Sequence, residues 1–462
     1  MSADHGSVGL VGAGPTGAML AILLRRRGFD VSVYEAGADP RGELAPSGRS
    51  INLALAARGI NALKRAGVYE EIAAECVPMR GRLIHDREGG TSLHPYGARP
   101  EEVIYSISRH RLNRALLDIA VRRHGVDVHF DHRLESADFD EEIAWMRDLR
   151  ADRLVPVPMR PLVASDGAGS RMRRDMHDAH LIDARERDLE HGYKELSIPA
   201  GPAGEYLMQR DALHVWPRGG YMLIALPNVD GSFTATLFLP KSGPDGFAGL
   251  TDPDRVERFL RANFADVVEL MPNRLREFAA HPTGFLGTVH AEPWSVRGIA
   301  ALIGDSAHAI VPFHGQGMNA CFEDCLYFDA CVARRTTWED RFADFFTARK
   351  ADTDAIAEMA LDNYREMRER VVDPKFQLQS ALSRELERRH PERFISRYSM
   401  VMFHDEIPYR VAETRGRVQS RLLADLTASA SSLGEVDFDL ARREVGARLP
   451  PLAQDLSSVM KL

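Results

Sequence analysis

The first thirty-five residues alternate between short apolar runs and a glycine-rich turn. Ser7–Val11 is an apolar run of strand length, and Gly12–Gly17 has the composition of a tight turn. A helix over Pro15–Arg27, closed by Gly28, and a second strand over Val31–Glu35 are expected to follow. The pattern predicts a βαβ unit at the start of the chain.

A further helix and two further strands are predicted beyond this unit. Apolar residues recur with a helical period over Arg109–His124, and the alternating segment Val126–Phe130 predicts a strand after it. The first domain is therefore expected to continue beyond an insertion that is rich in loops. Much later, Ile299–Ile303 predicts a buried strand.

Between about Asp175 and Phe285 the pattern changes to alternating apolar and polar residues, as in strands. Asn228–Gly231 has the composition of a hairpin turn. The expected strands include Glu205–Met208, Ala212–Trp216, Tyr221–Leu226 and Phe233–Leu239. This part of the chain predicts an antiparallel sheet.

From Gly315 onward the apolar spacing is mostly helical, and helices are expected over Glu339–Val371 and around Phe376–Arg388. Together the elements predict an α/β fold with a Rossmann-like domain, an antiparallel β-sheet domain and a helical C-terminal region. The expected boundaries are 1–174 and 291–374 for the two parts of the Rossmann-like domain, 175–290 for the sheet domain and 375–462 for the helical region.

The composition is typical of a globular protein. The 462 residues are 44% hydrophobic and 27% charged, which allows cores large enough to enclose a cofactor. The net charge of -8 is spread over segments of both signs, such as Asp138–Glu142 and Arg171–Arg174. No basic stripe is present, so nucleic-acid binding is not expected.

No segment predicts a signal peptide, a membrane span or a metal site. The apolar run Val8–Leu24 is interrupted by glycines, and no later run is long enough to cross a bilayer. The four cysteines do not suggest a disulfide framework. Cys321 and Cys325 could share a helix face, but nothing completes a zinc set, so we expect packing and no metal. A cytoplasmic location is expected.

The turn near the N-terminus has the glycine spacing of a dinucleotide-binding motif. Gly12 suits the tight turn, Gly14 admits a pyrophosphate, and Gly17, directly after Thr16, lets helix and strand approach closely. Glu35 ends the second strand, where a carboxylate can accept the hydroxyls of an adenosine ribose and repels a 2′-phosphate. FAD or NAD fits this site and NADP does not. Alone, such a motif can be a glycine-rich turn without a ligand.

Two later turns add carboxylates to this picture. After the predicted strand Ile299–Ile303, Asp305 could bind a polyol hydroxyl. Beyond it a helix starts near Gly317, and its N-terminal dipole would stabilise an anion on a flavin pyrimidine ring. Asp166 also follows an apolar strand, in a glycine-containing turn that could approach a pyrophosphate or ribose; alone it could be an ordinary turn.

The three motifs together resemble those of the single-component FAD-dependent aromatic hydroxylases. The resemblance implies one Rossmann-like FAD-binding domain, a substrate sheet over the isoalloxazine face and NADPH as a transient co-substrate. No second glycine motif is present, which agrees with a single dinucleotide domain.

Within that group the chain resembles the kynurenine 3-monooxygenase family from Val8 to about Arg410. The stretches that carry the resemblance are Gly48–Leu55, Met79–His85, His94–Gly97, Ser106–Arg109, His191–Leu196, Asp362–Arg368 and Arg397–Phe403. For substrate binding, it implies that Arg82, Tyr96, Asn363 and Tyr398 hold the amino-acid end of kynurenine. A guanidinium can pair bidentately with a carboxylate, and phenols and an amide add directional hydrogen bonds. Each residue alone would be read as an ordinary surface or packing position.

For FAD, the resemblance adds Ala54, Arg109, Leu134, Met318 and Asn319 to the motif residues. The implied reaction is the NADPH- and O2-dependent hydroxylation of L-kynurenine to 3-hydroxykynurenine through a flavin C4a-hydroperoxide. No catalytic residue is assigned, and His308 and His314 are not taken as bases, because the ring amine already activates the attacked carbon. The same chemistry on another aryl amine or kynurenine derivative, and a non-catalytic FAD-binding protein, stay as alternatives. The oligomeric state is not predicted.

Overall fold

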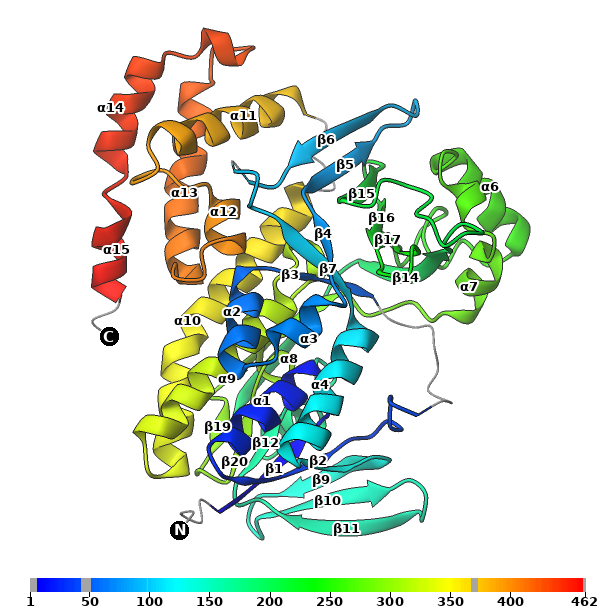
Figure 1. The fold of residues 1–462 in the computed structure, drawn as a ribbon, viewed down its shortest axis with the longest axis vertical. Helices are drawn as coiled ribbons and strands as arrows, with labels where there is room; N and C mark the ends of the chain where they lie inside the picture. Colours follow the sequence, from blue (N-terminus) through cyan, green and yellow to red (C-terminus); the bar gives the residue numbers. More distant parts are fainter. Residues whose placement is uncertain (1–5, 43–50, 98, 367–372, 460–462) are drawn as a thin grey trace. The chain divides into compact units, whose positions relative to one another are not determined.

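The computed structural model describes residues 6–42, 51–97, 99–366 and 373–459 (Figure 1). The chain divides into two compact units. The first unit comprises residues 1–76, 106–189 and 285–357, and the second comprises residues 77–105, 190–284 and 358–462. The four-part division expected from the sequence stays a prediction. Parts of two sequence stretches noted above, residues 48–50 and 367–368, lie outside the described residues.

The first unit is built on a mostly parallel six-stranded sheet. Its strand order is β19 (Ser295–Val296), β20 (Ala300–Leu302), β12 (Leu162–Ala164), β1 (Ser7–Val11), β2 (Asp30–Tyr34) and β8 (Asp127–His129). All neighbours are parallel except β19 and β20. This arrangement brings the turns after β1, β12 and β20 to the same end of the sheet.

Helices flank this sheet, and smaller sheets complete the unit. Helix α1 (Pro15–Arg26) packs against α4 (Arg109–His124) and α9 (Gly317–Arg334), and α9 packs against α2 (Ala57–Ala66). The other elements are β3 (Asn52–Leu55), α3 (Tyr69–Ala73), β9 (His132–Asp138), β10 (Ile143–Asp148), β11 (Arg153–Pro158), α5 (Arg171–Asp178), β13 (Asp183–Asp188), β18 (Gly287–Glu292), α8 (Asp305–His308) and the short 3-10 helix η2 (Pro312–His314). Two elements, β7 (Ile104–Ser108) and α10 (Trp338–Arg365), continue from one unit into the other.

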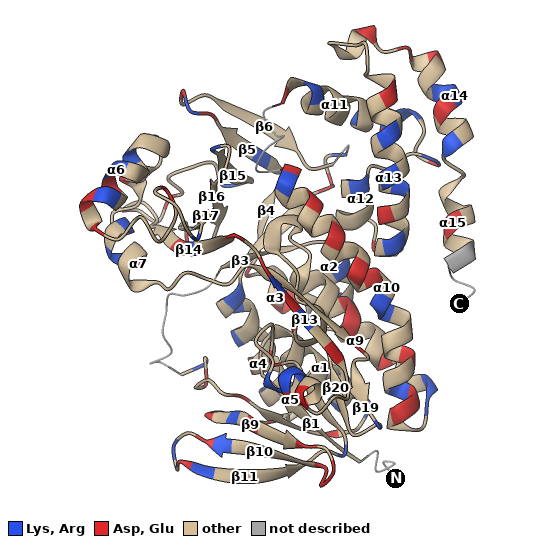
Figure 2. Cartoon of the chain, turned by 180° about the vertical axis from the view of Figure 1, so that it is seen from behind, with Lys and Arg blue, Asp and Glu red and all other residues tan. Residues whose placement is uncertain are grey.

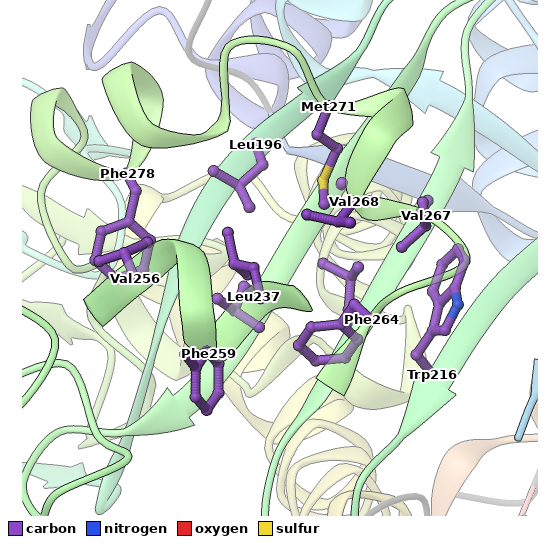
Figure 3. Close-up of a cluster of buried hydrophobic side chains, with 14 of the residues drawn as sticks. Leu196, Trp216, Leu237, Val256, Phe259, Phe264, Val267, Val268, Met271 and Phe278 are labelled. Carbon is purple, nitrogen blue, oxygen red and sulfur yellow. The ribbon is translucent and has the colours of Figure 1, made fainter. Parts of the chain in front are cut away.

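The second unit contains the other large sheet. Its order is β14 (His191–Ile198), β17 (Phe233–Pro240), β16 (Met222–Pro227), β15 (Ala212–Pro217), β5 (Gly81–His85) and β6 (Thr91–Pro95), and β4 (Val77–Met79) precedes β5. Only the β15–β5 pair is parallel. Side chains from α6 (Pro253–Asn263), η1 (Val268–Leu270) and α7 (Arg274–Ala280) pack with strand residues such as Leu196, Trp216 and Leu237 in one apolar core (Figure 3).

The C-terminal region is helical. It comprises α11 (Pro374–Arg389), α12 (Arg397–Met402), α13 (Tyr409–Leu426), η4 (Leu433–Glu435), α14 (Phe438–Arg448) and α15 (Leu452–Val459), with a core around Leu382, Leu386 and Leu422. Charges of both signs alternate along α6, α10 and α14 (Figure 2). Over the ranges that the structure describes, every helix is too short or too polar to cross a membrane.

The predicted α/β fold is confirmed, and most predicted elements occur within a residue or two of their expected bounds. One strand prediction is wrong. Residues 205–208 are irregular, with a bend at Leu207 and Met208, and they follow a tight turn in which Gly204 donates to the Gly201 oxygen and Gly201 to the Glu205 oxygen. The side chains of Tyr206 and Met208 pack on the apolar core although their backbone is not a strand. The alternation of apolar and polar residues in this segment therefore reflects core packing and not strand structure.

Two strands of the large sheet in the second unit were missed by the sequence interpretation. β5 and β6 lie nearly a hundred residues before the segment in which the sheet was expected. Pairing between such distant segments leaves no local pattern. Helix α10 ends at Arg365, and residues 367–372 of the longer helix that was expected lie outside the described residues.

Candidate functional site

The three glycines after β1 have the environments that a dinucleotide turn needs. Gly12 has a φ of +94°, and a Cβ there would lie 2.7 Å from the Ser165 carbonyl oxygen. A Cβ at Gly17 would lie 2.0 Å from the Gly12 oxygen, so helix and strand approach too closely for any side chain. A Cβ at Gly14 would have open space around it. Space for a pyrophosphate therefore lies at Gly14, beside the start of α1.

Glu35 is held at the end of β2 by main-chain donors. Its carboxylate accepts hydrogen bonds from the N–H groups of Ala13 and Gly37, each at 2.7 Å. Glu35 also lines a pocket of about 420 Å³ in the first unit. Gly12, Leu134 and Asp166, three other predicted cofactor residues, line the same pocket. Its size and its fixed carboxylate suit the adenosine half of a dinucleotide.

Asp166 lies in the turn after β12. One of its oxygens accepts from the N–H groups of Arg171 at 2.8 Å and Met172 at 3.4 Å. The other, Oδ1, is buried and has no hydrogen-bond partner among the described residues. Burial raises the pKa of this carboxyl group. The free oxygen can therefore accept a ligand hydroxyl.

Two residues that the sequence interpretation missed hold this turn in place. The Ser165 hydroxyl lies 3.0 Å from the Val11 oxygen and 2.9 Å from the Gly12 oxygen. The fully buried Arg173 donates to the Ser306 oxygen at 2.8 Å and pairs with Glu186. Arg173 thereby ties the Asp166 turn to the turn that carries Asp305. A buried arginine in a run of charged residues gives no signal in the sequence.

The Asp305 turn lies against α1 and α9. Gly304 has a φ of +66°, and a Cβ there would lie 3.1 Å from a methyl group of Thr16 and 3.0 Å from the sulfur of Cys321. Asp305 is partly exposed, and the Cys321 thiol lies 3.6 Å from its Oδ1 atom. The structure therefore brings Thr16 close to the turn that carries Asp305, although the two residues are far apart in the sequence.

Asn319 organises the loop before α9. Its side-chain oxygen accepts from the Ala56 N–H at 2.9 Å, and its nitrogen donates to the Ala54 and Gly315 oxygens, both at 2.8 Å. The side chain is fully buried. Asn319 therefore shapes the site, while the partly exposed Gly317 and Met318 form the first turn of α9. The side chain of Gln316, which precedes that turn, makes no capping hydrogen bond, so N–H groups of the turn can meet an anion.

His308 belongs to a buried ionic network behind this turn. Its Nε2 atom lies 2.6 Å from Asp324, which also accepts from Arg349 at 2.7 Å. Arg349 and Arg58 both pair with Glu323, at 2.8 Å and 2.7 Å. Burial alone would raise the pKa of Asp324, but His308 and Arg349 outweigh it and hold it low. This network fixes α8 to α9 and α10, so His308 has a positional role. His314 is buried in η2.

Arg109 lies apart from these contacts. It begins α4, its side chain is exposed, and its backbone N–H donates to the Ile51 oxygen at 3.3 Å. Its contact with a pyrophosphate stays a prediction.

In the second unit, three of the four predicted substrate residues form one cluster. The Arg82 guanidinium lies 5.1 Å from the ring centre of Tyr398 and 5.7 Å from that of Tyr96, and the two rings stack at 5.7 Å. We call Arg82, Tyr96 and Tyr398 the Arg82 cluster. The Nε atom of Arg82 and the hydroxyl of Tyr96 are buried without a hydrogen-bond partner among the described residues.

The charges in the Arg82 cluster are set by burial and by neighbouring groups. Burial raises the pKa of both Tyr96 and Tyr398, so both phenols keep their protons. Burial alone would lower the pKa of Arg82, but Tyr398, Tyr96 and Glu366 raise it. The cluster therefore presents a permanent cation and neutral hydroxyls, a set that suits a carboxylate.

Asn363 lies near the end of α10 and is buried. Arg397, which precedes Tyr398, bonds to Glu366 at 2.9 Å and to Asp362 at 3.4 Å. These bonds hold the turn of α10 that carries Asn363 against the start of α12, where Tyr398 lies. The fourth predicted residue is therefore in a segment tied to the cluster.

The residues of the first unit fit FAD. Open space at Gly14, a fixed carboxylate at Glu35, an oxygen of Asp166 that can accept a hydroxyl, and the uncapped start of α9 are the groups that its phosphates, ribose and flavin require.

Comparisons with known proteins support this assignment. Residues 6–334 match a family described as FAD binding domain. The kynurenine 3-monooxygenase of Stenotrophomonas maltophilia is 45% identical over 446 residues, 96% of this chain and 98% of the relative. That of Xanthomonas campestris pv. campestris is 44% identical over 451 residues, 98% of each chain.

Solved structures show the same fold at lower identity. A tetrameric form of 2-methyl-3-hydroxypyridine-5-carboxylic acid oxygenase matches with a TM-score of 0.63 and 19% identity, covering 81% of this chain and 95% of that one. A variant of Klebsiella pneumoniae HpxO complexed with FAD matches with a TM-score of 0.61 and 21% identity, covering 83% and 94%. With the sequence relatives at 45% identity over nearly the whole chain, this protein belongs to the kynurenine 3-monooxygenase family of FAD-binding monooxygenases.

Proposed function

We propose that this protein hydroxylates L-kynurenine to 3-hydroxykynurenine, with FAD as the bound cofactor and NADPH and O2 as co-substrates. The observation that carries the proposal is the Arg82 cluster, a charged guanidinium between two phenol rings in a chain that otherwise has an FAD site. When bound, FAD supplies the chemistry that accepts hydride from NADPH and activates O2.

The first unit would hold FAD through main-chain groups and carboxylates. The start of α1 at Gly14 would take the pyrophosphate, and Glu35 the adenosine ribose. Asp305 would bind the ribityl chain. The first turn of α9, at Gly317 and Met318, would stabilise negative charge on the reduced flavin ring.

The Arg82 cluster would bind the amino-acid end of the substrate. A carboxylate facing Arg82 would satisfy its guanidinium and accept hydrogen bonds from Tyr96 and Tyr398. Buried polar atoms without partners cost free energy, and a bound carboxylate removes that cost. Asn363 would add an amide contact from α10.

No side chain is needed as a base for ring attack. The amino group of an aniline donates electron density to its ortho carbon, so the protein has to place that carbon and exclude water. His308 is engaged by Asp324 inside the ionic network, which supports a positional role for it.

A second candidate is the same chemistry on a derivative of kynurenine or on another aryl amine. The Arg82 cluster distinguishes the two. A free amino acid carries the carboxylate that the guanidinium requires, whereas a decarboxylated substrate would leave a buried cation unpaired.

The purified, FAD-loaded protein tests the proposal. NADPH oxidation is measured with L-kynurenine, with its decarboxylated analogue and with neither, and products are identified by mass. We expect oxidation to be triggered by L-kynurenine, with a gain of one oxygen on the ring, and much less by the analogue. Triggering by the analogue alone would favour the second candidate. If neither compound changes NADPH oxidation, the protein either acts on another substrate or binds FAD without catalysis.

The cytoplasm is the proposed location, since the four cysteines are all free thiols, as is typical of reducing compartments. We propose no nucleic-acid partner, because the charges of both signs are interspersed.

A further inference from the structure

A chain of hydrogen bonds joins two histidines across the β5–β15 pair of the second unit. The Nδ1 atom of His85 lies 2.9 Å from Asp266 Oδ2, and its Nε2 atom lies 2.9 Å from Nδ1 of His214. The Nε2 atom of His214 lies 2.8 Å from the Gln209 carbonyl oxygen. His85 and His214 are 8% and 1% exposed, so the two rings are shielded from water, whereas the Asp266 side chain is 29% exposed.

The two ends of this chain determine how many protons it holds. A carboxylate and a carbonyl oxygen only accept, so His85 Nδ1 and His214 Nε2 must each carry a hydrogen. The bond between His85 Nε2 and His214 Nδ1 needs one more. Three protons on two imidazoles make one net positive charge. Two protons would leave one bond unmade, and four would set two N–H groups against each other.

The Asp266 carboxylate balances the positive charge that the third proton gives the two imidazoles. Asp266 also accepts from the indole N–H of Trp216 at 2.7 Å, and Trp216 stacks on His85 at 4.1 Å. Burial alone would raise the pKa of Asp266, but its bonds to His85 and Trp216 lower it, so it stays ionised. Burial, together with the charge on His85, lowers the pKa of His214 to about 4, so a fourth proton is disfavoured at neutral pH. Arg218, which donates to the His85 carbonyl oxygen, interacts electrostatically with Asp266, Asp86 and Arg87.

The histidine pair lies on the strand that carries Arg82. Side chains alternate along β5, so Arg82 is on one face of the sheet and His85 on the other, which is the face covered by the apolar core around Trp216 (Figure 3). In the parallel β5–β15 pair, Leu213 is opposite Arg82 and His214 is opposite Leu83. Arg218 adds a bond to the His85 carbonyl oxygen at 3.0 Å. These contacts fix the end of β5 and its register against β15. Because Arg82 lies on the same strand, they also fix the position of the Arg82 backbone.

We infer that His85, His214 and Asp266 are positioning residues whose hydrogen-bond chain holds a single shared positive charge and keeps Arg82 in place for the substrate carboxylate. The inference rests on the proposed role of Arg82. Loss of the third proton breaks one bond of the chain and loosens β5. The KM for L-kynurenine then rises while kcat changes little, because the residues act on binding through Arg82 and not on the oxygen transfer.

Nitrogen-15 NMR of histidine-labelled holoprotein counts the protons directly. The variants His85→Asn and His214→Asn assign the two rings by the signals that they remove. At neutral pH we expect one ring protonated on both nitrogens and the other on Nε2 only. Two neutral rings, or four protonated nitrogens, would overturn the inference. This count needs no activity, so it stands even if L-kynurenine is not the substrate.

Asp266→Asn tests the link to the substrate. Without the carboxylate the pair should be neutral at neutral pH, and the KM should rise about tenfold, with kcat within about twofold. The wild-type protein should show the higher KM at the pH at which the NMR count falls from three protons to two. His281→Asn is the matched control, because His281 also bonds a backbone oxygen of the sheet, that of Glu195, but lies outside the chain. A folded Asp266→Asn variant with a wild-type KM at every pH would overturn the positioning role. If that variant does not fold, the proton count and the wild-type pH profile of KM decide.

Discussion

In the first unit, Glu35 and Asn319 use both polar atoms of their side chains on main-chain groups, whereas in the second unit the Arg82 Nε atom and the Tyr96 hydroxyl have no hydrogen-bond partner among the described residues. The first arrangement fixes its side chains before a ligand binds. The second leaves buried groups for the ligand to satisfy. At the proposed cofactor site, Glu35 and Asn319 are thus fixed before a ligand binds, whereas the proposed amino-acid site leaves buried polar atoms for its substrate to satisfy.

The largest expected effect is at the glycine turn. Gly17→Ala places a methyl group about 2 Å from the Gly12 oxygen, so α1 must move away from the sheet. We expect loss of FAD and a destabilisation of about 3 kcal/mol or more, measured by flavin absorbance and by thermal unfolding of the protein without FAD.

Gly14→Ala is the matched control for this variant. A methyl group there has open space, so the protein without FAD should unfold at the wild-type temperature, while FAD binding weakens because the pyrophosphate space is filled. Equal destabilisation by both substitutions would contradict a preformed turn.

The next effect is at Arg82. Arg82→Ala removes the only charge that the Arg82 cluster offers to a carboxylate, and we expect the KM for L-kynurenine to rise by about 100-fold or more. FAD content should stay unchanged, since the cofactor residues belong to the first unit. Steady-state kinetics measure the KM, and the flavin absorbance of the same preparation measures the FAD content. A lost flavin with an unchanged KM would reverse the assignment of the two sites.

Tyr96→Phe should have a smaller effect. It should weaken substrate binding, while the free energy of unfolding stays equal or rises. The hydroxyl has no partner without substrate, so its removal should leave the stability equal or raise it by about 1 kcal/mol. With substrate the lost hydrogen bond should raise the KM about tenfold. Thermal unfolding and steady-state kinetics give the two values. A destabilised variant would show that the hydroxyl is satisfied within the protein.

The smallest effect is a pH dependence at Asp166. Burial raises the pKa of this carboxyl in the folded protein, so its contribution to stability is present at low pH and is lost as pH rises through the folded pKa. Asp166→Asn should therefore stabilise the FAD-free protein at neutral pH, by about 1 kcal/mol or less, and leave it unchanged under acid conditions. Unfolding curves from acid to neutral pH measure this. A variant that is less stable at neutral pH would contradict the sign.

Local features of the fold could be predicted from the sequence, and non-local ones could not. The unit from Ser7 to Tyr34 follows from apolar spacing and glycines, because each element is set by its own residues. The pairing of β5 with β15 joins segments more than a hundred residues apart and leaves no periodic signal. Residues 205–208 alternate like a strand but are irregular, because their apolar side chains pack on a core built by other segments.

The same distinction holds at the site. Gly12, Gly17 and Glu35 are recognisable because their roles depend on spacing within one turn. The contacts of Arg82 with Tyr96 and Tyr398 join three segments, and only the family resemblance marked these residues in advance. Arg173, which joins the Asp166 and Asp305 turns, had no signal of either kind. His85 ends a stretch that carries the family resemblance, but neither spacing nor resemblance marked its bond to His214.

The most direct test of the central claim is the amount and position of new hydroxyl formed per NADPH consumed by the FAD-loaded protein with L-kynurenine. The account predicts close to one 3-hydroxykynurenine per NADPH, because a substrate anchored at Arg82 presents one ring carbon for attack. NADPH consumption that yields only hydrogen peroxide, or a hydroxyl at another ring position, would contradict it.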